Sequence, residues 1–403
     1  MRREIAYKVL SEVTFKNRHA HIVLKELKLE AQDQAFVSAL VYTVLQNMMF
    51  IDYQFADLVD GKLPKEVKLV IRMGLTQHFK MNDIPDYAVV NTSVELAKGL
   101  KLHRYSGVVN KVIKKVIARG ERAIEGNALE IASIQHSMPL WIMKLLKAQY
   151  SEEFSIAYAE YCQSIKPTYI RMNGLNPSEF DPEIMEEVGN SIVAKQGLFR
   201  SPFLIEGHGV VQDINSQKVV PYMDLEDNLS VLDCCCGPGT KTLQIADMMH
   251  NTGIIHGVEL HETRTQATQE LMDRAKVTNT ELITSDVLEF ENDIDYDRIL
   301  LDAPCSGLGV LSHKHDLRYH IFPQDLDALV ALQSDMLDHV SKMLKVDGLL
   351  VYATCTLNKK ENERQIQAFL ERHDNYKLVK EETTNPMETS GDGFYFAQLV
   401  RIC

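Results

Sequence analysis

The spacing of apolar residues differs between the N-terminal and C-terminal parts of the chain. From residue 3 to residue 120, apolar side chains recur every three or four positions, as in Ala6, Val9, Leu10 and Val13. This period is typical of amphipathic helices, and no alternating strand pattern interrupts it. Glycine, aspartate and proline residues near positions 60, 83 and 120 mark the breaks between helices. Residues 1–125 are therefore predicted to form an all-α bundle of about five to seven helices.

Two other patterns follow after position 125. Residues 126–225 contain short helical and strand-like segments separated by prolines, which predicts an α+β connector. From residue 226 onward, apolar strands alternate with helices, beginning with VLDCCC and ending with FYFAQLVRIC. Such alternation predicts a parallel, doubly wound sheet that binds ligands at the carboxyl ends of its strands. The expected fold is therefore multidomain: an all-α bundle, an α+β connector and a Rossmann-like α/β domain over residues 226–403.

The composition places the chain among folded globular proteins. Of its 403 residues, 45% are hydrophobic and 25% are charged, which is far from the signature of disorder. No stretch is expected to approach the roughly 20 apolar residues of a membrane span. The start, MRREIAYKVL, lacks the apolar run of a secretory signal. A cytoplasmic, monomeric protein that does not associate with membranes is expected.

The seven cysteines lack the spacing of a disulfide framework. Free thiols in a reducing compartment fit their distribution better. Three of them are adjacent, at positions 234–236, and cannot easily close a tetrahedral zinc site. The cysteines therefore predict no metal site.

Positive charge is concentrated in the N-terminal part, although the whole chain has a net charge of −13. Residues 1–130 hold 20 Lys or Arg against 15 Asp or Glu. Within Lys98–Arg122, eight basic residues stand against a single acid, Glu121. Such a surface attracts nucleic-acid phosphates, and the alternative interpretation is an ordinary solvated helix face. The candidate RNA contacts are Lys111, Lys114 and Lys115.

A glycine-containing turn follows the first predicted strand of the α/β domain. The segment DCCCGPGTKT, residues 233–242, leads into a helix, and Gly237 and Gly239 let the backbone approach a ligand. It lacks the spacing of a P-loop and of the dinucleotide fingerprint. The next strand ends about 20 residues later in Glu259, whose carboxylate can accept hydrogen bonds from both ribose hydroxyls of an adenosine.

Acids also close the third and fourth strands of this domain. Asp286 ends TSD, where it suits an adenine amino group, and Asp302 ends RILLD. Helix capping explains any one of these polar ends, but polar groups on four consecutive strands favour a ligand site. Because phosphate-binding chemistry is absent, S-adenosylmethionine is expected as the cofactor rather than NAD or ATP.

Two cysteines stand at the ends of strands in the same domain. Cys305 lies in LLDAPCSG and Cys355 in VYATCT, at the expected ligand edge. Cysteine is commonly a small buried apolar residue, but two at this edge beside Asp302 indicate thiol chemistry. Carbon 5 of cytosine is a poor nucleophile, so its methylation needs prior addition of a thiolate to carbon 6. The pair therefore suits methylation of a cytosine.

Several segments resemble known families. IRMGLTQHFKMNDIPDYAVVNTSVELAK and SGVVNKVIKK are similar to the NusB-like RNA-binding domain. SMPLW, YIRMN and VQDINSQ resemble segments upstream of the catalytic domain in cytosine-specific rRNA methyltransferases, which gives the connector a share in RNA binding. DAPCSG, ATCT, ENE and DGFYFAQL resemble motifs of the bacterial Sun (Fmu, RsmB) family, whose members methylate carbon 5 of cytosines in small-subunit rRNA.

The resemblance implies roles for individual residues. Cys355 attacks the base, Cys305 assists product release, and Asp302 hydrogen-bonds the cytosine edge. The segment SHKHDLR, residues 312–318, departs from the family pattern, but Arg318 keeps a basic residue that is expected to contact RNA. The implied cofactor-binding residues are Cys235, Cys236, Gly237, Pro238, Gly239, Thr240, Lys241, Glu259, Asp286 and Asp302.

The expected substrate is small-subunit (16S) rRNA in a single-stranded or locally opened loop, because the target base must leave any stack to reach the site. Three alternatives remain open. One is a cytosine methyltransferase that acts on tRNA or another RNA, and a second is a protein methyltransferase. The third is a non-catalytic RNA-binding assembly factor, which would predict the loss of a cysteine or a strand-end acid, and all of these are present.

Overall fold

The computed structural model describes residues 2–59, 63–81 and 84–403, and its chain contacts form two compact units. Unit 1 comprises residues 1–164 and 311–322, and unit 2 comprises residues 165–310 and 323–403. The segment expected to form a connector at residues 126–225 is thus shared between the units. Residues 311–322 belong to unit 1, although the residues on both sides of them in the sequence belong to unit 2.

The described residues of unit 1 form helices and turns, as the apolar spacing predicts. The described residues among the first 120 form six α-helices, within the predicted range of five to seven. Their buried faces make one apolar core, in which residues such as Val9, Leu40 and Ile113 are fully buried or nearly so. The helices are α1 (Arg2–Lys16), α2 (Ala20–Lys25), α3 (Ala31–Phe55), α4 (Lys65–Lys80), α5 (Asp86–Gly99), α6 (Ser106–Arg119), α7 (Ala128–Gln135), α8 (Leu140–Gln149), α9 (Glu152–Tyr161) and α14 (Leu317–His320).

Helix α3 corrects one expectation from the sequence. Together with the turn that follows it, over Ala31–Leu58, it is long enough and, in one window of 18 residues with a mean hydropathy of 1.4, apolar enough to span a membrane by length and composition alone. The expectation that no stretch would approach this property was therefore wrong. Val37, Val41 and Val44 of α3 are fully buried in the core of unit 1. A core helix of a helical bundle passes the same test because it is apolar on most of its sides.

A small antiparallel sheet begins unit 2. Its strands are β1 (Tyr169–Met172), β2 (Met185–Val188), β3 (Ser191–Ala194) and β4 (Gly209–Val211), in the order β2-β3-β1-β4. Arg171 of β1 forms an ion pair with Asp247, a residue of the large domain, at 3.2 Å, and also donates to the Thr240 carbonyl oxygen. The small sheet is thereby fastened to the segment that follows the glycine turn.

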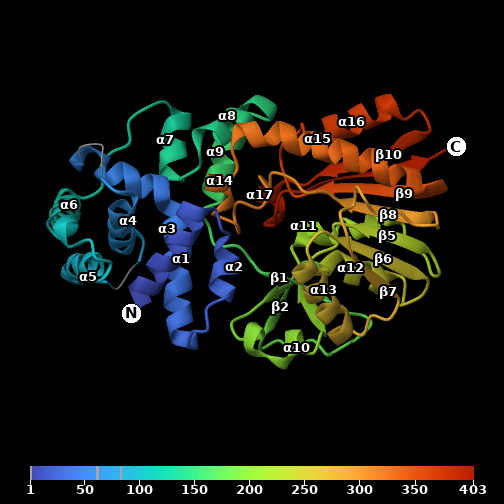
Figure 1. The fold of residues 1–403 in the computed structure, drawn as a ribbon, viewed down its shortest axis with the longest axis horizontal. Helices are drawn as coiled ribbons and strands as arrows, with labels where there is room; N and C mark the ends of the chain where they lie inside the picture. Colours follow the sequence, from blue (N-terminus) through green and yellow to red (C-terminus); the bar gives the residue numbers. More distant parts are fainter. Residues whose placement is uncertain (1, 60–62, 82–83) are drawn as a thin grey trace. The chain divides into compact units, whose positions relative to one another are not determined.

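A seven-stranded sheet forms the centre of unit 2 (Figure 1). Its order is β10-β11-β9-β8-β5-β6-β7; β5 to β9 run parallel, and β10 and β11 are antiparallel to their neighbours. The sequence thus correctly predicts a doubly wound α/β domain. The strands are β5 (Ser230–Cys234), β6 (Ile254–Glu259), β7 (Thr280–Thr284), β8 (Tyr296–Asp302), β9 (Leu344–Thr354), β10 (Tyr376–Thr383) and β11 (Tyr395–Arg401).

Helices cover both faces of this sheet. Val231 of β5 packs with residues of α12 (Thr240–Met248) and α13 (Glu262–Arg274). Its neighbour Leu232 points to the other face and packs with residues of α15 (Pro323–Val340) and α16 (Glu363–Arg372). This alternation follows from the two-residue period of a strand. The three remaining helices of the unit are short: α10 (Pro202–Ile205), α11 (Ile214–Gln217) and α17 (Pro386–Thr389).

Candidate active site

The carboxyl ends of the parallel strands meet at one edge of the large sheet. The register pairs Cys234 at the end of β5 with Val258 of β6 and Leu301 of β8. Asp302 at the end of β8 pairs with Ala353, two residues before Cys355. Since the strand order reverses between β5 and β8, this edge carries the crevice in which doubly wound sheets bind ligands.

The turn after β5 brings its main chain against Glu259. The Gly237 N–H donates to Oε2 of Glu259 at 3.2 Å. A Cβ atom on Gly237 would lie 2.5 Å from that oxygen, so a residue with a side chain would require the Glu259 carboxylate to shift. Gly239 has a φ of 94°, which also favours glycine, at the residue before α12.

Glu259 is a buried carboxylate at a strand end, with 2% of its surface exposed. It also accepts a hydrogen bond from the His261 N–H at 3.1 Å, and Arg264 lies 3.3 Å from its Oε1. A buried carboxylate beside the glycine-containing turn fits the ribose diol of an adenosine cofactor. Nothing in the local sequence around Arg264 singles it out, so sequence reasoning missed this residue.

Asp286 has a local partner in addition to its proposed role. It follows β7 and is half-buried, and its Oδ1 accepts a hydrogen bond from the Leu288 N–H at 2.9 Å. This bond is the turn-capping arrangement that the sequence also allowed for a single strand-end acid. The assignment of Asp286 to the cofactor remains a prediction.

Lys241 and Asp302 form an ion pair between the segments that follow β5 and end β8. The Lys241 Nζ atom lies 2.7 Å from Oδ2 of Asp302, with side-chain exposures of 10% and 28%. Burial alone would lower the pKa of Lys241, but the Asp302 carboxylate outweighs it and the pKa is raised. The Phe394 ring lies 5.3 Å from the same ammonium group. The sequence assigns Lys241 to the cofactor, whereas its charged group here contacts Asp302.

Asp233 is a buried acid that the sequence analysis did not single out. It has 1% of its surface exposed inside β5 and accepts a hydrogen bond from Thr242 Oγ1 at 2.7 Å. Burial, with a smaller contribution from the charge of Asp302, raises the pKa of Asp233 to about 7. A carboxylate inside the apolar strand VLDCC was the available signal, because buried acids are rare without a specific partner.

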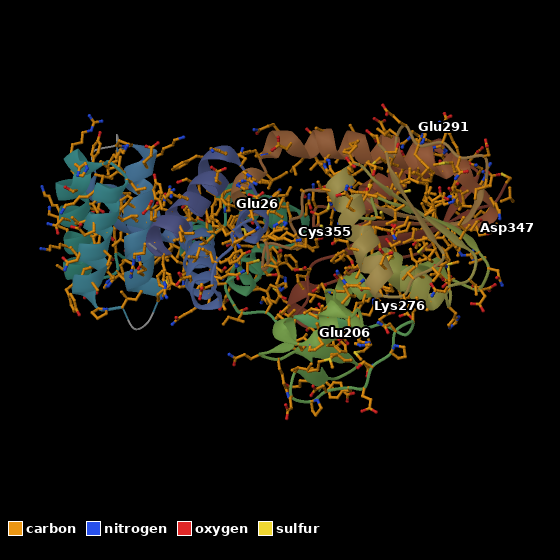
Figure 2. All side chains as sticks on the ribbon, turned by 60° about the horizontal axis from the view of Figure 1, so that its bottom comes forward. Glu26, Glu206, Lys276, Glu291, Asp347 and Cys355 are labelled. Carbon is orange, nitrogen blue, oxygen red and sulfur yellow. The ribbon has the colours of Figure 1, made fainter. Side chains whose placement is uncertain are left out.

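Cys305 and Cys355 come together at this edge, with their sulfur atoms 3.4 Å apart. Cys355 directly follows β9 (Figure 2). The hydrogen bond with Cys355 raises the pKa of Cys305 well above its ordinary value, and burial adds to the shift. A raised pKa makes Cys305 the poorer source of a thiolate at neutral pH. The positive charge of Lys241 interacts with Cys355, which favours the thiolate form.

Glu361 joins the loops that carry the two cysteines. Its fully buried carboxylate accepts hydrogen bonds from the N–H and hydroxyl of Ser306, the residue after Cys305, at 2.8 and 2.5 Å. The same Ser306 hydroxyl lies 2.8 Å from the Thr356 hydroxyl, beside Cys355. Gln333 and Asn358 donate to the carboxylate as well. The ENE segment was noted only for its resemblance, and the structure shows what its first residue contacts.

Two glycines hold the main chain of Cys355. The Gly309 N–H donates to the Cys355 carbonyl oxygen at 3.0 Å, and the Gly393 N–H donates to the Gly309 carbonyl oxygen at 2.8 Å. A Cβ atom on Gly309 would lie 1.9 Å from the Gly393 oxygen. These close approaches connect the cysteine loops with the DGFYFAQL segment near the C-terminus.

The predicted RNA contacts fall into two groups. Lys111, Lys114 and Lys115 are exposed on α6, as an RNA-binding face requires. Arg318 differs from the expectation, because only 1% of its surface is exposed. Its guanidinium donates to the carbonyl oxygens of Ser137 and Leu311 at 3.1 and 2.9 Å. A buried guanidinium that is occupied by carbonyl groups cannot also bind phosphate, so Arg318 supports the fold of unit 1.

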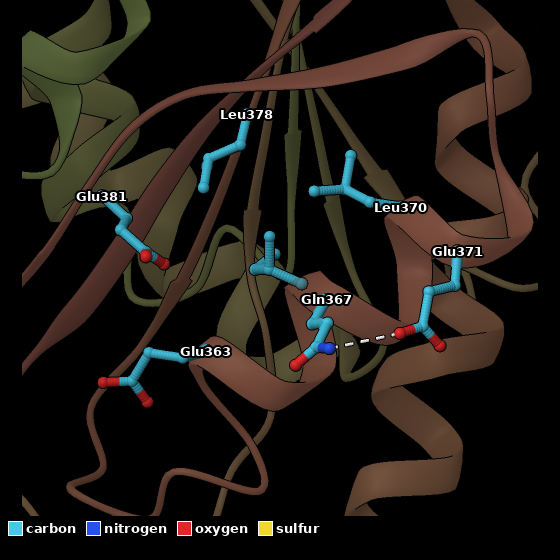
Figure 3. Close-up of a pocket in the computed structure, with 7 residues that line it drawn as sticks. Glu363, Gln367, Leu370, Glu371, Leu378 and Glu381 are labelled. Carbon is cyan, nitrogen blue, oxygen red and sulfur yellow. Dashed lines mark hydrogen bonds between the residues drawn. The ribbon is translucent and has the colours of Figure 1, made fainter.

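A pocket of about 450 Å³ lies elsewhere in unit 2, between α16 and β10 (Figure 3). It contains none of the predicted site residues, and its three carboxylates would repel RNA phosphates. The residues that line it are Glu363, Ile366, Gln367, Leu370, Glu371, Leu378 and Glu381.

Comparisons with known proteins match the N-terminal and C-terminal parts of the chain to two different families. A family model described as 16S rRNA methyltransferase RsmB/F matches residues 220–400, and the NusB family model matches residues 1–118. The NusB match covers most of the helical part of unit 1, and the methyltransferase match contains both cysteines and all three strand-end acids.

Individual proteins match over most of the chain. The probable ribosomal RNA small subunit methyltransferase B of Synechocystis is 28% identical over 98% of this chain and 98% of its own length. The corresponding Bacillus subtilis protein is 29% identical over 93% and 89%. A methyltransferase homologue from Pyrococcus horikoshii shares the fold, with a TM-score of 0.60, 23% identity, and coverage of 69% of this chain and 100% of its own. Residues 220–400 therefore belong to the 16S rRNA methyltransferase RsmB/F family, joined in one chain to a NusB-family domain at residues 1–118.

Proposed function

We propose that this protein methylates carbon 5 of a cytosine in small-subunit rRNA, with Cys355 as the covalent nucleophile and Cys305 assisting release. The observation that carries the proposal is the pair of sulfur atoms 3.4 Å apart at the edge of the sheet. The ion pair between Asp302 and Lys241 supports it, because Asp302 is the last residue of β8, just before the loop that carries Cys305. Two adjacent thiols suit a reaction that needs one nucleophile and one proton-transfer group.

S-adenosylmethionine is the cofactor of this domain, and it supplies an electrophilic methyl group when bound. Gly237, Glu259 and Asp286 would hold its adenosine portion. The buried Glu259 carboxylate beside the main chain of Gly237 supports this assignment.

The chemistry of the base follows from the two thiols. The Cys355 thiolate forms a bond to carbon 6 of cytosine, and the displaced electron pair makes carbon 5 nucleophilic toward the methyl group. After carbon 5 has been methylated, its proton is removed with the help of Cys305. The electron pair of that C–H bond re-forms the ring double bond, and the Cys355–carbon 6 bond breaks to return the thiolate. Asp302, held by Lys241, accepts a hydrogen bond from the exocyclic amine of the base.

The RNA substrate is supported by two independent features. Relatives that match nearly the whole chain are named for small-subunit rRNA, and the exposed lysines of α6 offer charge to a phosphate backbone. The proposed target is a single-stranded or locally opened loop, because the base must leave its stack to reach the two sulfur atoms at the carboxyl ends of the strands. A cytoplasmic location is proposed with this substrate, since a mechanism that uses two thiols suits a reducing compartment.

Single substitutions distinguish the roles of the two cysteines. With Cys355→Ala, the bond to carbon 6 cannot form, so neither methylated cytosine nor a covalent protein–RNA complex is expected. With Cys305→Ala, addition and methylation still occur but release is slow, so a complex that survives denaturing electrophoresis accumulates. Bisulfite sequencing of rRNA from cells that carry each variant reports the methylated position.

Exchanged results would reverse the roles of the cysteines while leaving the reaction intact. Full methylation by both variants would refute covalent catalysis. Methylation confined to tRNA in the same sequencing would refute the rRNA substrate while keeping the chemistry. Cys162→Ala is the matched control, because Cys162 is a buried cysteine of unit 1 and its removal leaves the pair intact.

A further inference from the structure

A second cluster of chemically active side chains lies in unit 1. His19 stands between α1 and α2, and Asp316 and His320 stand at the two ends of α14. One nitrogen or oxygen atom from each residue lies within 4.8 Å of the other two. His19 and Asp316 are 297 positions apart in sequence, so folding alone brings the cluster together.

The ring of His320 is oriented by the main chain. Its Nε2 atom lies 3.0 Å from the Val13 carbonyl oxygen, which can only accept, so Nε2 carries the hydrogen. The neutral ring then has a lone pair on Nδ1. That atom is buried and has no hydrogen-bond partner among the described residues, and only 9% of the side chain is exposed. A carbonyl that fixes the tautomer in this way is the usual companion of a metal-binding histidine.

The lone pair of His320 faces a carboxylate. Oδ2 of Asp316 lies 3.9 Å from Nδ1 of His320 and 3.1 Å from Nδ1 of His19. Asp316 is 3% exposed. Its Oδ2 atom also accepts a hydrogen bond from the Ala20 N–H at 3.2 Å. A cation between the buried carboxylate and the buried lone pair of His320 would satisfy both groups.

We propose that His19, Asp316 and His320 bind a divalent metal ion of the zinc class. Two imidazoles and one carboxylate are a ligand set that this class prefers. Bonds of about 2.0–2.1 Å in a tetrahedron place ligand atoms about 3.3 Å apart. The distances of 3.1 and 3.9 Å from Oδ2 of Asp316 are close to this value, and the third separation, within 4.8 Å, must contract when the ion binds. The fourth position is open to water or to His21, whose ring stacks 5.8 Å from that of His19.

The ion would fasten residues 311–322 to the start of the helical bundle. The cluster joins this segment to α1 through Val13 and to α2 through Ala20. This proposal departs from the prediction that the chain binds no metal, because its ligands come from segments 297 positions apart in the sequence. Binding to the folded state alone would raise the thermal stability of the protein.

The test is a zinc titration of the full-length, chelator-treated protein that carries Cys305→Ser and Cys355→Ser, so that the thiol pair cannot supply ligands. We expect calorimetry to show one equivalent bound and the melting temperature to rise with zinc. His19→Ala and His320→Gln should weaken binding at least tenfold and abolish the rise. His320→Gln keeps a side-chain amide that can donate to the Val13 oxygen. Circular dichroism without metal confirms that each variant is folded.

His313→Ala is the matched control, because it removes an exposed histidine of the same segment that is outside the cluster. It should bind zinc as the parent does. Cobalt(II) substitution reports the ligand type, and a spectrum without sulfur-to-cobalt bands is expected. The proposal would be overturned by saturation without one equivalent bound, or by His19→Ala and His320→Gln binding zinc as tightly as the parent does. A cobalt–thiolate spectrum would overturn it too.

Discussion

The carboxylate of Glu361 joins the loops that present Cys305 and Cys355 through its hydrogen bonds to Ser306, whose hydroxyl also contacts Thr356. Four hydrogen bonds converge on it, from Ser306, Asn358 and Gln333. Glutamine at this position has the same shape, but its amide nitrogen cannot accept a hydrogen bond. The carboxylate therefore holds the sulfur atoms at their separation through backbone positions, as a positioning residue.

Glu361→Gln should lower kcat by roughly 10- to 100-fold and leave KM for RNA nearly unchanged, because a misplacement of about 1 Å at reacting groups has effects of this size. Steady-state methylation of an rRNA fragment over a range of RNA concentrations measures both constants. Glu371→Gln, an exposed acid on α16, is the control. The positioning role would be refuted if KM for RNA rose by as much as kcat fell. It would also be refuted if the variant lost stability with no change in kcat.

Asp233 makes stability depend on pH in an unusual direction. Its pKa is raised from 3.8 to about 7 by burial first and by the charge of Asp302 second. An acid with a higher pKa in the folded state stabilises the fold while it is protonated, and this contribution is lost as pH rises from about 4 through 7. The wild-type protein should therefore lose roughly 2–3 kcal/mol relative to Asp233→Asn between pH 5 and pH 8.

Urea unfolding of both proteins at pH 5 and pH 8 measures this difference. Asp297→Asn serves as the control. Burial would raise the pKa of Asp297, but Lys345 and Ser230 lower it below its ordinary value. Its contribution is present above about pH 4 and constant from pH 5 to pH 8. A pH-independent difference for Asp233→Asn would show that the carboxyl is already ionised at pH 5.

Helix α6 presents a basic face at the scale of a whole element. Val112, Ile113 and Val116 are buried, and Lys111, Lys114 and Lys115 lie exposed between them, as helical periodicity dictates. Replacing the three lysines by glutamine should weaken RNA binding and reduce the slope of log affinity against log salt by about 2, since fewer counterions are released. Filter binding across a salt series measures the slope.

The matched control removes three lysines from the first two helices instead, with Lys8→Gln, Lys16→Gln and Lys25→Gln. Lys8 and Lys16 already pair with glutamates on α1. Their removal should change the slope less. Equal slopes for the two triple variants would identify the α6 lysines as an ordinary solvated face.

The path of the whole chain depends on the segment 311–322. This segment leaves unit 2 after β8, joins unit 1, and returns at α15. Arg318 fixes it there, because its guanidinium satisfies the buried carbonyl oxygens of Ser137 and Leu311. Arg318→Ala should lower the free energy of unfolding by about 2–4 kcal/mol, since both carbonyls lose a charged donor.

Chemical denaturation of the full chain measures the effect, with Lys314→Ala as the control. Lys314 is an exposed cation in the same segment, and its loss should cost little stability. The salt dependence of RNA binding should not change in Arg318→Ala. A change in that slope at unaltered stability would return Arg318 to the RNA interface.

The local sequence alone was enough to predict most of the elements and the domain types, although strand β10 was not predicted. Apolar periodicity determines which faces are buried, so the helices of residues 1–120 and the βαβ alternation after residue 226 follow directly from it. The strand-end acids and cysteines are local too, because the carboxyl ends of parallel strands must share an edge. Composition could not reveal that α3 is a core helix, because burial depends on the helices around it.

Contacts between distant residues were decided only by the tertiary structure. The burial of Arg318, the Glu361 contacts and the His19–Asp316–His320 cluster join positions separated by 181, 55 and 297 residues. The partner of Lys241 was likewise not predictable from local sequence. Its motif predicts a cofactor-binding turn, whereas its ammonium group contacts Asp302, 61 positions further along the sequence. Periodicity reports which side of an element is buried, but a side chain's partner depends on how the elements pack against one another.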